Sequence, residues 1–310
     1  MQELTQPANF TPDGKRIPGG MSWRDWVLWR AKRRMNKMLG RPTTPQVVGL
    51  SAMVSQLREA AQAKLGARVK AAVLSQPEYV TVTEEEVGDV FDYLGIKNLM
   101  PDKRDPLFSQ LFATSAAYAG YGKGLCRNYT DVYGCETEEY FFPSRWNLFL
   151  DYSQDSLSGG FDLVRKARMF RVRNKFVEPS LGLRQLSAYK DEDVYWAKVA
   201  NRIREFVKST LQDVQELVLT GESASDQRFR TALRNALADF SSGQGSVVLE
   251  GQENFEMLNQ TDQPDFLYAT ANGAAEFAKR RQEGMARCLL PDKCRGNRQS
   301  ENETAASKEL

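Results

Sequence analysis

Most of the chain divides into segments with apolar residues at helical spacing and short runs that are apolar throughout. Residues 44–66 and 193–211 have the helical period, so each is predicted to form an amphipathic helix. Their apolar side chains are expected in the core: Val47, Leu50, Val54, Leu57, Ala61 and Leu65 in the first helix, and Val199, Ile203, Phe206 and Leu211 in the second.

Short apolar runs predict strands at 69–77, 217–220 and 245–251, and residues 147–164 indicate two strands joined at Ser153–Ser156. Further helices are predicted over 83–95 and 265–283, and the small residues of 112–124 suit close helix packing. Helices that alternate with short strands are typical of a layered α/β fold.

Residues 22–39 predict a helix of a different composition. A Ser cap at Ser22 precedes a Trp-rich stretch, and a basic run follows from Lys32 to Arg34. One interpretation is a basic helix that binds a surface, and the other is an amphipathic helix whose basic face is solvated. We favour the second interpretation.

The charge balance narrows the possible chemistry. The chain has 310 residues with 42 Lys and Arg against 40 Asp and Glu, so the net charge of +2 gives no reason to expect nucleic acid or an anionic membrane as an obligatory partner. His is absent, which removes Ser/His and Cys/His nucleophile pairs, His-ligated zinc and His general bases. Any catalysis must therefore use carboxylates, Lys or backbone amides.

Cysteines and glycosylation sequons bear on the compartment. No apolar run is long enough to span a membrane, and the first 20 residues lack the core of a signal peptide, so the chain as written is expected to be cytoplasmic. The secretory pathway is the alternative, since two local cysteine pairs could form disulfides and four Asn-x-Thr sites could be glycosylated. These are Cys126/Cys135, Cys288/Cys294, and Asn9, Asn128, Asn259 and Asn302. Neither cysteine spacing favours zinc.

Several collinear segments resemble the nucleotide-binding domain of the seventy-kilodalton heat-shock chaperones, in the actin-like ATPase superfamily. Residues 50–79 resemble the family's helix and the strand that ends in a Val-Pro-Ala-Tyr-type turn, with Pro77 and Tyr79 in matching places. Residues 115–124 resemble its Ala-rich helix, 148–158 its second phosphate hairpin, 218–233 its adenosine-side motif and 264–278 its Gly-Ala-Ala helix. The resemblance implies a two-lobed, ribonuclease H-like α/β fold. The strands at 71–74 and 217–220 should then lie in different sheets.

The resemblance also implies candidate site residues. Asp151 stands where the second phosphate hairpin begins, and would be the catalytic carboxylate that organises magnesium. The implied nucleotide contacts are Thr220, Gly221, Ser223, Arg228 and Gly273, with Arg230 as an alternative to Arg228 for stacking on the base. ATP or ADP is the implied cofactor, with magnesium only if ATP binds.

The same comparison exposes departures from the family's pattern. The first phosphate hairpin, Asp-x-Gly-Thr-Thr in the family, has no counterpart before Thr44, and the family's acidic Glu-Pro-Thr-Ala-Ala position falls on Ala113. The glycines of the second hairpin are replaced by Ser153, Gln154 and Asp155, whose side chains obstruct close approach of phosphate. We therefore expect weak or no nucleotide binding.

The expected organisation is a polar leader over 1–20, an incomplete first lobe over 21–145, a second lobe over 146–290 and a polar tail over 291–310. The leading hypothesis is a degenerate ATPase domain that acts as an interaction module with an unidentified protein partner, without nucleic acid or a membrane span. The alternative is an ATP-binding chaperone-type ATPase whose first phosphate hairpin lies upstream of Met1.

Overall fold

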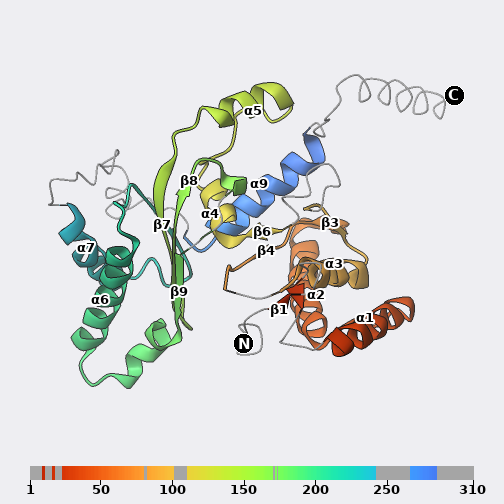
Figure 1. Cartoon of the computed structure of the whole chain (residues 1–310), viewed down its shortest axis with the longest axis horizontal. Helices are drawn as coiled ribbons and strands as arrows, with labels where there is room; N and C mark the ends of the chain where they lie inside the picture. Colours follow the sequence, from red (N-terminus) through yellow and green to blue (C-terminus); the bar gives the residue numbers. More distant parts are fainter. Residues whose placement is uncertain are drawn as a thin grey trace.

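The computed structural model describes residues 9–10, 16–17, 23–79, 82–100, 110–169, 172, 174–241 and 266–284. Helices and strands form layers in which a central sheet separates two groups of helices (Figure 1). The α/β fold class predicted from the sequence is confirmed. The strand predicted at 245–251 and the pair Cys288/Cys294 lie outside the described residues.

The central sheet has four strands in the order β10-β7-β8-β9. β7 (Arg145–Tyr152), β8 (Leu157–Val164) and β9 (Asn174–Glu178) form an antiparallel meander, as the two-strand prediction for 147–164 requires. β10 (Glu216–Thr220) pairs with β7 in parallel. Because the two strands run the same way, the loops that follow them emerge at the same edge of the sheet.

Side chains of β7 and β10 alternate between two cores, one on each face of the sheet. Leu148, Leu150 and Tyr152 pack under α6 (Glu192–Thr210) and α7 (Gln227–Ser241). Phe149 and Val218 pack on the opposite face, with α4 (Ala113–Gly120) and α9 (Ala269–Glu283). Figure 1 shows α6 and α7 to the left of the sheet and α4 and α9 to its right.

Two glycines let the backbones of α4 and α9 touch. A Cβ built on Gly273 would lie 1.6 Å from the backbone oxygen of Ala116, and one on Gly120 would lie 1.9 Å from that of Ala269. Neither position can hold a side chain without moving one helix. The small residues predicted to suit helix packing therefore do so here.

The first part of the chain is mainly helical. α2 (Pro45–Leu65) is capped by the Thr44 side chain, and α3 (Glu84–Leu94) by a reciprocal capping box of Thr83 and Glu86. The strand predicted at 69–77 forms two short pieces, β3 (Ala71–Ala72) and β4 (Ser75–Gln76). They pair in parallel with β5 (Lys97–Asn98) and β6 (Leu111–Phe112) respectively, whereas β1 (Asn9–Phe10) pairs with β2 (Arg16–Ile17). β3 and β10 thus lie in different sheets, as predicted.

Three predicted core residues are exposed instead. Leu57, Leu65 and Leu211 are 64%, 68% and 88% exposed. Leu57 and Leu65 belong to the helical period of α2, but the buried residues of this helix, Val47, Ser51 and Val54, all lie in its first half. Leu211 is the left-handed C-cap of α6, so its side chain turns away from the helix. The other predicted residues of α6, Val199, Ile203 and Phe206, are buried.

The preferred interpretation of residues 22–39 is also wrong in part. α1 (Trp23–Met38) uses two basic residues to pack on the body, because Arg33 and Lys37 both pair with Asp89 of α3. Its aliphatic residues Val27 and Leu28 are exposed. The basic face is therefore not simply solvated.

A short arm leaves the α4 side of the molecule and contains α5 (Val132–Tyr140). A disulfide joins Cys126 to Cys135 at its base, with a Cα–Cα distance of 5.1 Å. The local pairing considered from the sequence is therefore present for this pair. Short 3-10 turns at Ala167–Met169, Pro179–Leu181 and Leu183–Ala188 complete the described elements.

Candidate functional site

Asp151 and Thr220 meet at the shared edge of β7 and β10. They are register partners in the parallel ladder, and the Thr220 hydroxyl donates a 2.7 Å hydrogen bond to the Asp151 carboxylate. Burial raises the pKa of Asp151, the Thr220 hydrogen bond partly opposes this, and the nearby charge of Glu222 raises it further. The acid implied to organise a metal is thus held by a neighbouring strand.

The turn between β7 and β8 satisfies its own backbone donors. The amide of Ser153 donates to the Ser156 carbonyl at 3.0 Å, and those of Asp155 and Ser156 donate to the Ser153 hydroxyl at 3.3 and 3.1 Å. The amide of Gln154 donates to the Glu222 carboxylate at 2.8 Å. All four amides that could face a phosphate group therefore have acceptors within the protein.

The loop after β10 closes on the same turn. Gly221 has φ +102°, and a Cβ there would lie 2.2 Å from the Tyr152 carbonyl oxygen, so the position requires Gly. Ser223 donates its amide to that carbonyl at 3.1 Å, and its hydroxyl lies 3.2 Å from the Gln154 side-chain nitrogen. The close approach of these two loops explains why glycine follows Thr220 in the sequence.

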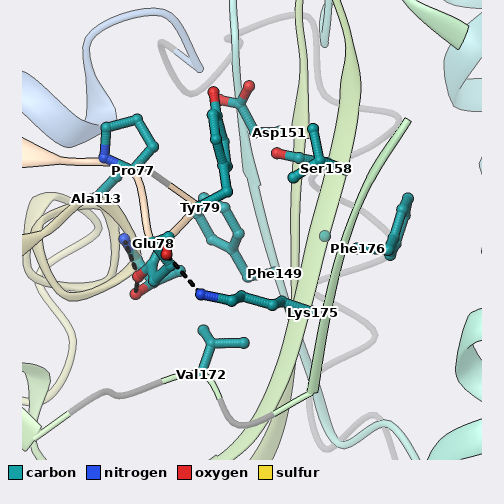
Figure 2. Close-up of a pocket in the computed structure, with 14 residues that line it drawn as sticks. Pro77, Glu78, Tyr79, Ala113, Phe149, Asp151, Ser158, Val172, Lys175 and Phe176 are labelled. Carbon is teal, nitrogen blue, oxygen red and sulfur yellow. Dashed lines mark hydrogen bonds between the residues drawn. The ribbon is translucent and has the colours of Figure 1, made fainter. Parts of the chain in front are cut away.

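A small cavity lies on the α4 face of the sheet, beside Asp151 (Figure 2). Its volume is about 60 Å³, room for a few water molecules and well below the roughly 300 Å³ at which ligand pockets begin. The walls combine a turn after β4, the start of α4 and the strands β7 to β9. They include Pro77, Glu78, Tyr79, Ala113, Phe149, Ser158, Lys175 and Phe176.

Glu78 is the acidic group in this cavity that sequence reasoning missed. Its carboxylate accepts hydrogen bonds from both the amide and the hydroxyl of Thr114, at the start of α4. The N-cap residue of α4, Phe112, makes no side-chain capping bond, so Glu78 caps this helix from a distant segment. A carboxylate therefore lies beside Ala113, where the resembled family has its own acid. An acid directly after a predicted strand was the available signal.

Two cavity residues carry charge of opposite sign. Burial raises the pKa of Glu78 despite the Thr114 hydrogen bonds and the Lys175 charge that lower it. The Lys175 amino group donates to the Glu78 backbone carbonyl at 2.6 Å (Figure 2). The cavity can hold water or a small polar group between weakly acidic carboxyls. Asp151 and Glu78 oppose the approach of a phosphate.

The remaining implied contacts lie elsewhere. Arg228 forms ion pairs with Glu192 and Asp193 of α6, on the sheet face opposite the Asp151 cavity. Gly273 lies in the contact of α9 with α4. Arg230 is 7% exposed, and its Nε and Nη1 atoms have no hydrogen-bond partner among the residues that the structure describes. The structure therefore brings together Asp151, Thr220, Gly221 and Ser223, and not Arg228 or Gly273.

Comparisons with known proteins give little further information. No protein-family profile matches the chain, and no curated protein matches it in sequence. One similar solved structure is the ethanolamine utilization protein EutJ from Carboxydothermus hydrogenoformans, with 16% identity, 74% of each chain covered and a TM-score of 0.41. A likeness at this level supports no argument about activity.

Proposed function

We propose that this protein is a non-catalytic relative of the actin-like ATPases that serves as a protein-interaction module. Two facts support the affiliation. The segments that resemble the second phosphate hairpin and the adenosine-side loop emerge at one edge of a single sheet, because β7 and β10 are parallel. The strands of the first part of the chain lie outside that sheet, as a two-lobed fold requires.

The main observation behind the proposed loss of activity is that the backbone amides of the β7–β8 turn already have hydrogen-bond acceptors within the protein. A triphosphate is held by backbone N–H groups aimed at its oxygens. The amides of residues 153–156 instead donate to Ser156, Glu222 and Ser153. To bind phosphate, the turn would first have to break these hydrogen bonds, and this cost offsets much of the free energy gained from new hydrogen bonds to the phosphate.

The charge around the turn supports the same conclusion. Asp151 lies near the end of β7, Asp155 and Glu222 lie on the two loops, and Arg184 pairs with Asp155 at 2.8 Å. Like charges a few ångströms apart repel even at the protein surface. A polyphosphate would therefore approach three carboxyl groups, and Arg184, the cation beside them, already pairs with Asp155.

The arm that contains α5 supports an interaction role. Tyr133, Tyr140 and Phe141 are 62%, 65% and 76% exposed on it. Tyr and Phe are enriched at protein interfaces and cost little rotamer entropy to bury. The Cys126–Cys135 disulfide fixes the base of this arm.

Calorimetric titration of the full chain with ADP and with ATP-magnesium tests the proposal. We expect no micromolar binding, no hydrolysis, and ADP or adenosine no weaker than ATP if either is detected. Asp151→Ala is the informative variant. Micromolar ATP binding that requires magnesium and disappears in Asp151→Ala would show a working ATPase site instead.

A further inference from the structure

α1 is oriented unusually for a surface helix. The face toward the body contains Trp26, which is 9% exposed, together with Arg33 and Lys37. Arg33 pairs with Asp89 at 2.5 Å and with Glu85 at 2.6 Å, and Lys37 pairs with Asp89 at 3.3 Å. Ion pairs with α3 therefore attach this helix to the body.

The opposite face of α1 is aliphatic. At 100° per residue, the aliphatic residues and methionines of the helix and the residue after it fall within an arc of about 120°, and its tryptophans lie outside that arc. We call this arc the α1 stripe; its members are Val27, Leu28, Ala31, Met35, Met38 and Leu39. Leu28, Met38 and Leu39 are 68%, 82% and 58% exposed. An amphipathic helix normally buries such a stripe.

Basic residues border the stripe on both sides. Arg34 lies next to Val27 on the helical wheel, and Lys32 lies next to Leu39. Arg24 lies at the middle of the arc, in the first turn of the helix. All three are exposed. Asp25 lies beyond Lys32 and outside the arc. The surface around the stripe is therefore positively charged, although the whole chain is nearly neutral.

We propose that the α1 stripe docks on an anionic lipid bilayer, with α1 lying in the plane of the headgroups. Apolar residues enter the boundary of the acyl chains while the flanking Lys and Arg contact anionic headgroups. α1 lies at the periphery of the molecule, away from the central sheet, so a flat surface can reach it (Figure 1). Among the described residues, no helix is long and apolar enough to cross a bilayer, and this mode needs none.

Charge complementarity favours the bilayer over a second copy of this chain. Two α1 stripes packed together would bring Arg24, Lys32 and Arg34 close to the same residues of the other copy. Like charges at such an interface oppose association. A surface that carries many negative headgroups has the complementary sign.

The test uses flotation of the full chain with vesicles of phosphatidylcholine alone and with added phosphatidylserine. We expect binding to the anionic vesicles that weakens as salt is raised. Leu28→Glu with Met35→Glu should reduce that binding by about tenfold or more, because two charges replace aliphatic groups that would enter the bilayer. The matched control, Leu57→Glu with Leu163→Glu, changes two exposed residues on α2 and β8 and should bind as the wild type does.

Circular dichroism shows whether each variant is folded. A further variant, Arg24→Glu with Arg34→Glu, changes the charge and leaves the apolar residues of the stripe unchanged. We expect it to weaken vesicle binding as well. Equal binding of the Leu28→Glu, Met35→Glu variant and the wild type overturns the proposal. So does binding of polyglutamate without binding of vesicles, which indicates an acidic protein partner. Concentration-dependent dimerisation through the stripe, without vesicle binding, indicates a second copy and also overturns it.

Discussion

The backbone amide of Gln154 donates a hydrogen bond to the Glu222 carboxylate at 2.8 Å and thereby ties the turn after β7 to the loop after β10. This bond joins two loops that are 68 residues apart in the chain. It uses an amide that a phosphate-binding turn would present to its ligand. The two loops therefore stabilise each other.

Removing the Glu222 carboxylate tests this relationship. We expect Glu222→Ala to lower the free energy of unfolding by about 0.5–1.5 kcal/mol, the net value of one hydrogen bond. ATP affinity should stay undetectable, since Ser153 still accepts from two of the turn's amides. Urea denaturation measures the first effect and calorimetry the second. A gain of micromolar ATP binding would mean that one bond alone keeps the turn closed.

Asp89 is the residue on which attachment of α1 depends. Its side chain is 1% exposed and accepts hydrogen bonds from Arg33 and from Thr43, the latter at 2.6 Å. We expect Asp89→Asn to destabilise the protein by about 3 kcal/mol because it leaves a partly buried guanidinium without its main partner. Asp92→Asn is the control. Asp92 pairs with Lys37 at the surface, and losing this exposed ion pair should cost at most about 1 kcal/mol. Similar losses for both variants would contradict the special role of Asp89.

The pH dependence of this attachment has a definite sign. Burial raises the pKa of Asp89, but the hydrogen bonds from Arg33 and Thr43 and the charges of Arg33 and Lys37 together lower it below its usual value of 3.8. A lowered folded-state pKa contributes stability that is present above the unfolded pKa and lost as pH falls through the folded one. The difference between wild type and Asp89→Asn should therefore shrink only in strong acid.

Glu78 should show the opposite pH dependence. Burial raises its pKa above the usual 4.5, so the folded protein holds the proton of Glu78 to a higher pH than the unfolded chain does. Its contribution is complete below the unfolded pKa and is lost as pH rises through the folded pKa. Glu78→Gln keeps an acceptor for Thr114 without the charge, so its stability relative to wild type should rise as the pH rises above the unfolded pKa of Glu78. Thermal unfolding at a series of pH values measures this, and a gap that narrows with rising pH would contradict it.

The α4–α9 contact allows a matched pair of glycine substitutions. Gly273→Ala should destabilise the protein by about 1–3 kcal/mol or more, because its Cβ would overlap the backbone of Ala116. Gly49→Ala, in the second turn of α2, meets nothing within 4 Å among the described residues and should stabilise by about 0.5–1 kcal/mol. Opposite signs in chemical denaturation are the expected result. A neutral Gly273→Ala would show that the helices separate easily.

The disulfide also has a measurable contribution. Cys126 and Cys135 are 9 residues apart, and closing a loop of this size stabilises a protein by about 2–3 kcal/mol through the unfolded state. Cys126→Ser with Cys135→Ser should lose that amount in urea denaturation. The wild type in the presence of a thiol reductant should match the variant. Unchanged stability in both would mean that the arm folds without the bond.

The sequence predicted the part of the fold whose pattern is local. β7, β8, β10 and α6 follow from short apolar runs and from helical period, and the meander needs only a short turn. Thr220 and Gly221 were identified because residues 218–233 resemble the adenosine-side motif of the chaperone family. These elements need no distant residue to explain them.

Other features depend on which surfaces face each other, and the sequence pattern does not contain that information. α1 is attached to the body by ion pairs with Asp89 as well as by Trp26, and the helical period alone did not show that Arg33 of the basic run packs on the body. Glu78 caps α4 from a segment 36 residues away, which no local capping rule detects. The partner of Gln154 was equally hidden, because Glu222 lies on another strand's loop.

Under the proposed function, the closed turn at residues 153–156 would also make the stability of this protein independent of nucleotide concentration. A protein that binds a ligand only when folded gains free energy as ligand concentration rises, and its melting temperature rises with it. A turn whose donors are already satisfied has no such linkage, so the folded population should not change with the energy state of the cell. An unchanged melting temperature in a large excess of ATP-magnesium is the expected observation, and a rise would reveal the missing linkage. The concentration of folded protein that a partner can bind would then stay the same when the ATP concentration changes.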